Sequence, residues 1–588
     1  MHEHLQALHR ALSVEQRAEA EEHARLQALS EEEQIAAGFA WPTLVTTGVE
    51  RAGRRYRLML QAPKGVVLHD GIGPGEPVTV DGSEGFCVGV EEHHAEVMVS
   101  HRIEEGREVR VSRRHDPITF VRYRQALERA DEASSALKDR LLGENVEAED
   151  RAKNAPDEEG PLEGLDPAQR AAARHALDAE VLAVVHGPPG TGKTRMLAAV
   201  LAALVARGER AWALADSNAA VDHLALKAAE QGLEVLRLGH TARIGSAAAP
   251  LTLDARIAAC HLGPALAALD KEIARTDGYA LRKLLDERRA LRQKARTLVY
   301  ESADVIASTF GTLVRVAPEL PPVRTAVVDE ATQATEPAVW VAVPFVERLV
   351  LVGDPHQLGP VSKANSGLER SLLQRLVEEA RVPLPMLEVQ YRMATPIREL
   401  VAEVYGPSYR DDPTAAAQRL DDLPATTWLD TSGAELREAI DPTTKSLFNE
   451  GEAALVALAV DELRTRGLAP ERIGVITPYS AQVACLERQA ALQGVKIATV
   501  NAFQGREKDA IAVSWVRSNE QGELGFVSDG RRLTVALTRA RRWLWLVGDA
   551  ATLASHPRFS TIIAHHERIG ALSSVWEPPW SAVLDDLP

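Results

Sequence analysis

From about residue 180 onward, short apolar runs alternate with longer amphipathic stretches. The first series (EVLAVVHG, RAWALA, DVIAS, TAVVDE, RLVLVGD) falls within residues 180–354. A second series (PMLEVQ, TTWLD, RIGVITP, KIATV, DAIAVSWV, RWLWLVGD) falls within residues 385–549. Apolar runs of this length are typical of strands buried on both faces, and their alternation with helices indicates a parallel sheet. The pattern therefore predicts an α/β fold with two domains in tandem.

The first 155 residues have a different pattern. Residues 1–36 are polar and rich in Glu and predict a helix. Short runs with alternating apolar and polar residues follow, separated by Gly, Pro and Asp: YRLMLQ, PVTV, FCVGV and AEVMVS. Such alternation predicts a small antiparallel β-barrel. A second helical stretch follows at 121–142, and then an acidic linker with Pro and Gly. The barrel is thus expected between two helices.

These patterns divide the chain into six predicted segments. They are an N-terminal helix (1–40), a small β-barrel accessory domain (41–120), a helical stalk with an acidic linker (121–155), a first α/β domain (156–382), a second α/β domain (383–565) and a C-terminal tail (566–588). A helical insertion is predicted within the first α/β domain at about 255–300, as a hairpin that turns at Thr276-Asp277-Gly278.

Composition narrows the class of protein without naming a partner. The 588 residues are 45% hydrophobic and 26% charged, which is ordinary for a globular protein. The net charge of -17 argues against nucleic-acid binding by bulk attraction but leaves room for a local basic groove. No run is long and apolar enough for a membrane helix, so no membrane partner is expected. The three cysteines are far apart in sequence, which argues against a zinc module and against disulfides. Such cysteine usage predicts that the protein is located in the reducing cytoplasm.

A glycine-rich loop lies between a predicted strand and a predicted helix. It reads Gly187, Pro188, Pro189, Gly190, Thr191, Gly192, Lys193 and Thr194. Glycines allow backbone N–H groups to wrap phosphate oxygens, and the helix N-terminus adds partial positive charge. Lys193 is expected to reach the β- and γ-phosphates, and the Thr194 hydroxyl to bind Mg²⁺. The alternative is a plain Gly-rich turn, but the strand–loop–helix context favours a P-loop that binds ATP.

An acidic pair ends a later apolar run, in RTAVVDEATQATEP. Asp329 is predicted to hold Mg²⁺ through water, and Glu330 to orient or deprotonate the attacking water. Alone, Asp-Glu is a common pair on solvated loops. The preceding P-loop and strand favour the catalytic interpretation.

Further motifs follow in a fixed order: LVLVGDPHQLGPV, MLEVQYRM, VNAFQGREKD and RRLTVALTRAR, with LDPAQRAAARHAL before the P-loop. Together they resemble superfamily 1 helicases of the 5′-to-3′ branch, which includes the nonsense-mediated-decay and immunoglobulin switch-region-binding helicases. The resemblance covers residues 165–565 and implies two RecA-like domains that hydrolyse ATP in the cleft between them. It also implies movement along single-stranded DNA or RNA, or along a tailed duplex.

The resemblance also assigns residues around the nucleotide. Gln169 would contact the adenine edge, Tyr391 would stack on the base and Gln357 would sense the γ-phosphate; a helix residue, a buried tyrosine and a loop glutamine are the alternatives. Arg392 and Arg539 would stabilise the charge of the transferred phosphoryl group across the cleft. Gly505 would let the backbone pass close to a ligand, and Glu507 is a candidate partner for the ribose or for these arginines. A surface turn is the alternative for this last stretch.

The resemblance also implies that three further motifs contact the nucleic-acid strand. Their residues are Ser217, Asn218, Ser308, Thr309, Thr477, Tyr479 and Gln482. Hydroxyl and amide donors suit sugar-phosphate contacts without sequence preference, although helix N-caps use the same residue types. Basic residues of the hairpin (Arg282, Lys283, Arg288, Arg289, Arg292, Lys294, Arg296) and of the barrel (Arg51, Arg54, Arg55, Arg57) are steering candidates, with a solvated face as the alternative.

Two positions depart from the family pattern. Asn501 stands where the family usually has Asp, and Thr534 stands where it usually has Asn. Neither residue is expected to contact phosphate, so ATP hydrolysis is expected to be retained. The property that these two departures could alter is the coupling of hydrolysis to movement along the nucleic acid. The resemblance predicts an ATP-dependent helicase. An ATPase that remodels protein–nucleic-acid complexes without unwinding, and a non-catalytic ATP-gated clamp, are the alternatives.

Overall fold

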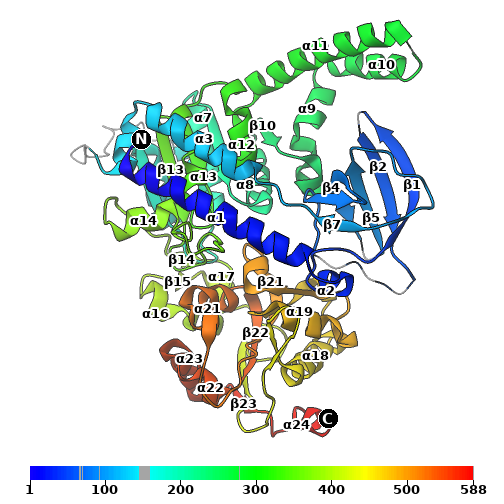
Figure 1. Cartoon of the computed structure of the whole chain (residues 1–588). Coiled ribbons are helices and arrows are strands. Elements are labelled where there is room, and N and C mark those ends of the chain that lie inside the picture. The colour runs from blue at the N-terminus through cyan, green and yellow to red at the C-terminus, as the bar shows by residue number, and fades with distance from the viewer. Residues whose placement is uncertain are drawn as a thin grey trace. The chain divides into compact units, whose positions relative to one another are not determined.

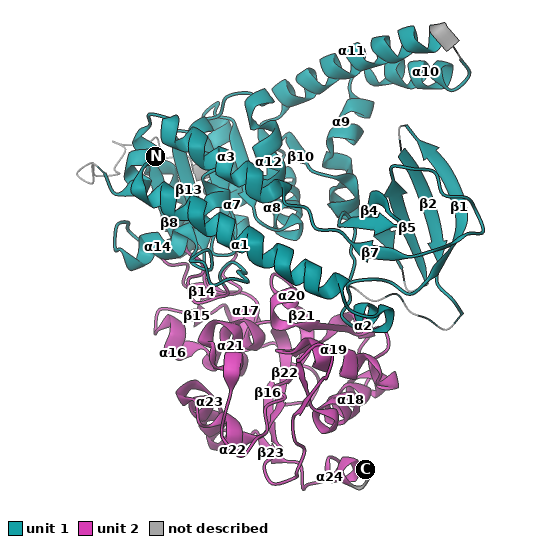
Figure 2. Ribbon diagram, viewed as in Figure 1, with its two compact units in different colours: residues 1–185, 193–353, 359–385 teal, residues 186–192, 354–358, 386–588 magenta. Residues whose placement is uncertain are grey.

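A computed structural model describes residues 1–586 except 54, 65, 67, 69–70, 92, 145–158 and 277. The described chain divides into two compact units, which Figure 2 distinguishes by colour. Unit 1 comprises residues 1–185, 193–353 and 359–385, and unit 2 comprises residues 186–192, 354–358 and 386–588. Most of the predicted acidic linker lies outside the described residues.

A six-stranded sheet with parallel pairing forms the centre of unit 1. Its strands are β8 (Leu182–His186), β9 (Ala211–Ala215), β10 (Val235–Leu238), β11 (Val305–Thr309), β12 (Thr325–Val328) and β13 (Arg348–Gly353), in the order β10-β11-β9-β12-β13-β8. Its helices include α6 (Pro167–Asp178), α7 (Lys193–Ala206), α8 (Asn218–Glu230) and α12 (Phe310–Val316). Almost every strand residue is buried, which explains the continuous apolar runs of the sequence.

The N-terminal part of unit 1 holds a seven-stranded antiparallel sheet. Its strands are β1 (Leu44–Ala52), β2 (Arg55–Gln61), β3 (Pro77–Val80), β4 (Ser83–Val90), β5 (His94–Val99), β6 (Glu108–Val109) and β7 (Val111–Arg113), in the order β6-β1-β2-β5-β4-β3-β7. The edge strands β6 and β7 are joined through Arg110 alone. The two edge strands of the sheet are therefore neighbours along the chain. Leu58, Leu60, Val97 and Val99 line the buried face.

Two helical segments before and after this sheet pack against the parallel-sheet core. They are α1 (Glu3–Gln27) and α3 (Ile118–Glu132), which is followed by α4 (Ala136–Leu142). Leu5, Leu12 and Leu127 join one hydrophobic cluster with strand residues such as Leu214 and Leu236. The predicted single helix over 1–36 is in fact two helices, because Ser30 caps a separate helix, α2 (Glu31–Ala36), through a capping box with Glu33.

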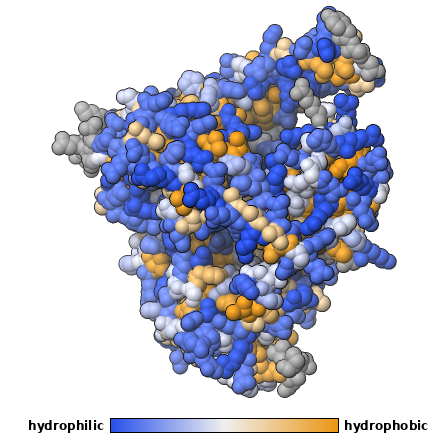
Figure 3. Space-filling view, viewed as in Figure 1, coloured by the Kyte–Doolittle hydropathy of each residue, from blue (hydrophilic) through white to orange (hydrophobic). Residues whose placement is uncertain are grey.

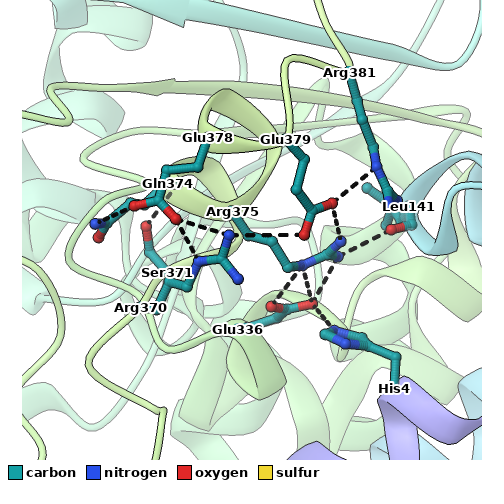
Figure 4. Close-up of polar contacts among 10 residues, drawn as sticks. All are labelled: His4, Leu141, Glu336, Arg370, Ser371, Gln374, Arg375, Glu378, Glu379 and Arg381. Atoms are coloured by element: carbon teal, nitrogen blue, oxygen red, sulfur yellow. Dashed lines mark hydrogen bonds and ion pairs between the residues drawn. The ribbon is translucent and has the colours of Figure 1, made fainter.

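A buried ion pair fixes the start of α1 on unit 1 (Figure 4). Glu336 begins α13 (Glu336–Val339), and its carboxylate accepts hydrogen bonds from Arg375 of α14 (Leu372–Glu378) at 2.8 Å (Nη2–Oε1). The His4 Nε2 atom lies 2.7 Å from the same Oε1 atom. Both Glu336 and Arg375 are buried, so each depends on its partner to offset desolvation.

The predicted helical insertion is formed by α9 (Leu253–Ala259), α10 (Gly263–Ile273) and α11 (Gly278–Ser302). Figure 1 shows α10 and α11 running side by side, and residues of the two helices are in contact. Asp277, in the predicted turn, lies outside the described residues.

A second six-stranded sheet, also with parallel pairing, forms the centre of unit 2. Its strands are β16 (Thr426–Asp430), β19 (Ile473–Thr477), β20 (Lys496–Thr499), β21 (Lys508–Ser514), β22 (Ala540–Gly548) and β23 (Leu572–Ser574), in the order β20-β19-β21-β22-β16-β23. Its helices include α18 (Glu450–Thr465), α19 (Ser480–Glu487), α21 (Gly530–Leu537) and α23 (Pro557–Arg568). Two expectations change here. The strand expected at 385–390 is only β14 (Val389–Gln390), paired with β15 (Arg410–Asp411) outside the main sheet, and the expected tail contributes β23.

Hydrophilic residues cover most of the face seen in Figure 3, with apolar residues scattered among them. Among the described residues, no helix combines the length and the apolar character needed to cross a membrane.

Candidate functional site

The P-loop joins β8 to α7, and its backbone has the left-handed turns that glycine allows. Gly190 and Gly192 have φ angles of 73° and 76°, where residues with a Cβ atom are strained. The Thr191 hydroxyl donates to the Pro188 carbonyl at 2.7 Å and so holds the loop together. The loop leads directly into a 14-residue helix, whose first N–H groups have no intrahelical acceptor. This geometry suits an anion such as a phosphate chain.

The first residues of α7 meet the acidic pair after β12, all within unit 1. The Thr194 hydroxyl donates to Asp329 Oδ2 at 2.8 Å, and Lys193 Nζ lies 3.7 Å from Glu330 Oε1. Thr194 and Asp329 are 135 residues apart in sequence. The parallel sheet brings them together because the carboxyl ends of β8 and β12 lie on the same edge.

Asp329 and Glu330 occupy different environments. Asp329 is buried, and that burial together with the charge of Glu330 raises its pKa to about 6, against the opposing effects of Lys193 and Thr194. Glu330 has a φ angle of 50°, an uncommon conformation for a residue with a side chain, and it keeps partial exposure. Backbone strain of this kind is frequent at functional positions.

The residues present fit a magnesium ion only in part. A hydroxyl and a carboxylate oxygen are ligands that Mg²⁺ prefers, and Thr194 and Asp329 place them 2.8 Å apart. Among the described residues, no group of three or more His, Cys, Asp or Glu side chains is arranged to hold a metal ion. Thr194 and Asp329 are the residues that would hold a magnesium ion here.

In unit 2, one aspartate organises the loop that carries Gln357. Asp354 accepts hydrogen bonds from Gln357 Nε2 at 2.8 Å and from the Tyr405 hydroxyl at 2.7 Å. The Gln357 Oε1 atom accepts from Arg539 Nη2 at 3.1 Å. Because Arg539 has no acceptor atom, both ends of the Gln357 amide are fixed. Asp354 was not among the predicted site residues, although its place directly after a buried strand was a usable signal.

Arg392 and Glu507 form an ion pair in unit 2, and Arg392 Nη1 also donates to the Thr538 carbonyl at 3.0 Å. Glu507 is shared with Arg541. Burial alone would raise the pKa of Glu507, but the charges of Arg392 and Arg541 lower it to about 2. The structure thus pairs Glu507 with one of the predicted arginines. Gly505 has a φ angle of 76°, and a Cβ atom there would meet no described residue, so conformation alone explains the glycine.

The turn that presents Tyr391 and Arg392 depends on a residue that sequence reasoning missed. Gln390 is buried, its Oε1 accepts from the Arg392 backbone N–H at 2.8 Å, and its Nε2 donates to Asp411 at 2.7 Å. Tyr391 remains 37% exposed, and its backbone N–H donates to the Gly190 carbonyl at 2.8 Å. An exposed ring suits the predicted stacking role better than the buried alternative.

Gln169 is buried at the start of α6, where its Oε1 accepts from the Asp166 backbone N–H at 3.2 Å. This bond completes a capping box, in which Asp166 also accepts from the Gln169 N–H. Gln169 thus has a structural role as a helix residue, which was the alternative to its predicted contact with adenine. The adenine contact stays a prediction.

Unit 1 contains a cleft of about 1040 Å³ between α1, α3, the seven-stranded sheet, the segment after β10 and α12. Asn218 and Thr309 line it, whereas Ser308 is buried behind them and Ser217 caps α8 through a bond from the Ala220 N–H. Its Lys and Arg side chains are Arg55, Arg113, Arg114, Arg122, Arg243, Arg315 and Lys363. They come from separate segments, so the sequence gave no signal that they would meet.

Two arginines of this cleft stand out. Burial and the nearby charge of Arg315 lower the pKa of Arg122. Among the described residues, neither Arg122 nor Arg315 has a hydrogen-bond or ion-pair partner for its guanidinium group. Arg113 and Arg114, in contrast, are paired with Glu76 and Glu84. The charge of Asp116, which also lines the cleft, acts in the opposite direction on the pKa of Arg122. Two neighbouring arginines that form no ion pair among the described residues can attract an anion.

The residues of unit 2 that were predicted to contact the nucleic acid are buried. Gln482 is fully buried, and its amide is held by the Asn449 backbone and by Ser514 Oγ at 3.0 Å. Thr477 is also fully buried, and Tyr479 is 4% exposed with its ring against Phe526. Gln482 is thus held inside unit 2, and the nucleic-acid contacts of these three side chains stay predictions.

Several basic residues that were candidates for steering the nucleic acid form ion pairs or other contacts within the protein. In the hairpin, Arg288, Arg292 and Arg296 pair with Asp270, Asp254 and Glu319. Such pairs reduce the free positive charge that those arginines offer. In the seven-stranded sheet, Arg57 pairs with Glu96, and Arg55 lies over the Phe86 ring and lines the cleft. Arg54 lies outside the described residues.

Family comparisons agree with this geometry. Residues 368–551 match a family described as an AAA domain, and residues 164–277 and 271–365 match a second family with the same description. Fold and site thus define a protein with P-loop ATPase domains. An arterivirus nonstructural protein 10 helicase, solved with DNA, aligns with a TM-score of 0.39 and 13% identity over 86% of this chain and 79% of that one, too distant a likeness to bear on the architecture.

Curated relatives place the chain more narrowly. It is 30% identical over 548 residues to DNA polymerase alpha-associated DNA helicase A of Saccharomyces cerevisiae, covering 80% of each protein. It is 33% identical over 463 residues to DNA-binding protein SMUBP-2 of Mesocricetus auratus (72% of this chain, 46% of that protein). It is 37% identical over 434 residues to regulator of nonsense transcripts 1 of Caenorhabditis elegans (69% of this chain, 40% of that protein).

The chain belongs to the Upf-like family of superfamily 1 helicases. It spans about half the length, or less, of the SMUBP-2 and nonsense-transcript relatives that it matches.

Proposed function

We propose that the chain hydrolyses ATP and uses it to move 5′-to-3′ along single-stranded DNA or RNA, separating duplexes that carry a single-stranded tail. The observation that carries the proposal is the joining of Lys193, Thr194, Asp329 and Glu330 at one edge of the unit 1 sheet, within hydrogen-bond or ion-pair distance. That set matches the roles of phosphate binding, magnesium binding and water activation in phosphoryl transfer.

In this proposal, Lys193 holds the β- and γ-phosphates, and Glu330 orients the attacking water and accepts its proton. Thr194 and Asp329 would hold Mg²⁺, which neutralises phosphate charge when bound. Gln357, Arg392 and Arg539 keep the roles that the family resemblance assigns to them, as do Gln169, Tyr391, Gly505 and Glu507. We also assign both parallel sheets to RecA-like domains and the seven-stranded sheet to an inserted barrel.

The cleft of unit 1 is the proposed path of the strand. Asn218 and Thr309 supply neutral donors, and Arg122 and Arg315 supply charge. Contacts of this kind hold sugar-phosphate without reading sequence. The three cysteines are free, which supports the cytoplasmic location that we propose.

ATP hydrolysis is tested with Lys193→Ala, measured as phosphate release with and without single-stranded DNA or RNA. We expect a loss of about 100-fold or more, because a charged contact to the developing phosphate charge is removed. Lys227→Ala is the control, since Lys227 pairs with Glu230 on the surface of α8. Unchanged hydrolysis in Lys193→Ala would overturn the site assignment. No stimulated hydrolysis in the unmutated chain would instead favour the ATP-gated clamp.

The strand path is tested by the salt dependence of single-strand binding in the double variant Arg122→Ala, Arg315→Ala. Each lost phosphate contact is expected to reduce the slope of log K against log salt by about 0.7. Arg466→Ala is the control, because Arg466 lies outside the cleft and pairs with Glu462. An unchanged slope in the double variant would exclude this cleft as the path.

Strand separation and its direction are tested on duplexes with either a 5′ or a 3′ single-stranded tail. The proposal expects displacement with the 5′ tail alone. Displacement with the 3′ tail alone would reverse the direction. No displacement on either tail, with stimulated ATP hydrolysis intact, would favour an ATPase that remodels protein–nucleic-acid complexes.

A further inference from the structure

An arginine on the edge strand of the unit 1 sheet is fully buried beneath the first turn of α8. Arg237 lies on β10, and its side chain has no exposed surface. Its Nε donates to Asp222 Oδ1 at 2.7 Å, and its Nη1 donates to the Leu238 carbonyl. A buried guanidinium needs acceptors for its donors, so the surroundings of Arg237 are fixed by its own geometry.

The third partner of Arg237 is Asn218. Arg237 Nη2 donates to Asn218 Oδ1 at 3.0 Å. A guanidinium has donors only, so the amide atom that faces it must be the oxygen. This contact removes the usual ambiguity between the two ends of an asparagine amide.

The other end of the amide is therefore a donor on the side away from Arg237. Asn218 lines the basic cleft, and its Nδ2 has no hydrogen-bond partner among the described residues. Ser217 beside it is committed to capping α8, so its oxygen already accepts the Ala220 N–H. Accepting that bond leaves the Ser217 hydroxyl proton available, but Ser217 does not line the cleft, so Asn218 is the residue of this turn that offers a donor there.

Arg237 also fixes the rim of the cleft next to Asn218. Asp222, one helical turn after Asn218, uses Oδ1 for Arg237 and Oδ2 for the Gly245 backbone N–H at 2.7 Å. The segment before Gly245 includes His240 and Arg243, which line the cleft. One buried side chain thus orders both the start of α8 and the loop after β10.

We propose that Arg237 is a positioning residue for nucleic-acid binding: it holds the Asn218 amide so that its NH₂ group donates to a phosphate or sugar oxygen of the strand. This rests on the proposed path of the strand through the cleft. Arg237 does not touch the strand itself, because it is buried.

The test uses fluorescence anisotropy of a labelled oligothymidylate, a strand without secondary structure, and the full chain. Asn218→Ala removes the donor and is expected to weaken binding about threefold to tenfold, the range of one neutral hydrogen bond. Asn218→Asp keeps an oxygen for Arg237 but presents a second oxygen to the phosphate, so it is expected to bind more weakly than Asn218→Ala. Arg237→Lys keeps the charge but loses the fork, and is expected to match Asn218→Ala.

A double-mutant cycle separates positioning from general destabilisation. If Arg237 acts through Asn218, then Arg237→Lys in the Asn218→Ala background causes no further loss of affinity. Arg348→Lys is the matched control: Arg348 is a buried arginine of the same sheet, bonded to Thr325 and Glu209 and outside the cleft. It is expected to lower the Tm as Arg237→Lys does, with unchanged strand affinity. The KM for ATP is expected to stay constant in all these variants.

Additive losses in the double variant would overturn the positioning role, as would tight binding by Asn218→Asp. Failure of the proposed function is a different result, because then the unmutated chain itself would not bind the strand. Retained binding by the unmutated chain with equal affinity in Asn218→Ala would also reject the inference, while leaving the ATPase assignment intact.

Discussion

Unit 1 and unit 2 each bury a glutamate, and the pKa values of the two carboxyl groups are shifted in opposite directions. Glu336 in unit 1 is held by Arg375 and His4 (Figure 4). Glu452 in unit 2 accepts from the Ser514 hydroxyl at 2.6 Å and from the Val516 N–H at 2.8 Å, without an ion-pair partner among the described residues. Burial alone would raise the pKa of either group.

The difference lies in the partners. His4 and Arg375 outweigh burial and lower the pKa of Glu336 to about 2. Two neutral donors do not outweigh it for Glu452, whose pKa burial raises to about 8, with the charge of Asp549 adding to the effect. Burial of a carboxyl group therefore says little by itself. A buried carboxyl group stays charged when a cation lies beside it.

The largest effect is expected at Glu452. Its pKa rises from 4.5 in the unfolded chain to about 8 when folded, so between these values the folded chain keeps a proton that the unfolded chain has lost. The free energy of unfolding should therefore fall with rising pH, by about 1.4 kcal/mol per unit. Urea unfolding at intervals from pH 5 to 8 measures this slope, and Glu452→Gln is expected to remove it.

The control for this slope is Glu462→Gln, an exposed residue of the same helix that pairs with Arg466. It should keep the slope of the unmutated chain. A slope that persists in Glu452→Gln would show that other groups carry it.

A smaller effect of opposite sign is expected at Glu336. Its pKa falls from 4.5 in the unfolded chain to about 2 when folded, so its stabilisation is complete above pH 4.5 and is lost as the pH falls toward 2. A shift of this size corresponds to about 3 kcal/mol. Acid unfolding of Glu336→Gln should show less loss across this window than the unmutated chain.

Glu378→Gln is the matched control for acid unfolding, because Glu378, at the end of α14, forms an exposed pair with Arg370. Exposed pairs contribute little to stability, so its acid transition should match that of the unmutated chain. An identical transition in Glu336→Gln would contradict the pairing with His4 and Arg375.

The smallest effects compare the polar turns of the two sheets. Thr309 is the last residue of β11 in unit 1 and lines the cleft, whereas Gln482 lies on α19, after β19 of unit 2, and its amide is bonded to Asn449 and Ser514. Gln482→Ala should lower the free energy of unfolding by about 1–3 kcal/mol and leave single-strand affinity unchanged. Thr309→Ala should do the reverse, with affinity lowered about threefold. Loss of affinity in Gln482→Ala with unchanged stability would restore Gln482 to the strand contacts.

Residues adjacent in sequence were the easiest part of the site to predict. Lys193 and Thr194 are fixed relative to the P-loop by the chain itself, and Asp329 was recognisable from the strand that precedes it. Gln390 and Asp354 were missed because their effect is indirect: they hold Arg392 and Gln357, and nothing in their own spacing says so.

Sequence by itself determined the alternation of strands and helices, the family and the order of its motifs, since these depend on local periodicity and on residues close along the chain. Tertiary structure alone decided which polar turns face a cleft and which are covered. It also brought Arg122 and Arg315 together from separate helices and buried Arg237 under Asn218. The physical reason is that burial, desolvation and charge pairing depend on neighbours distant in sequence, and those neighbours are set only when the sheets pack.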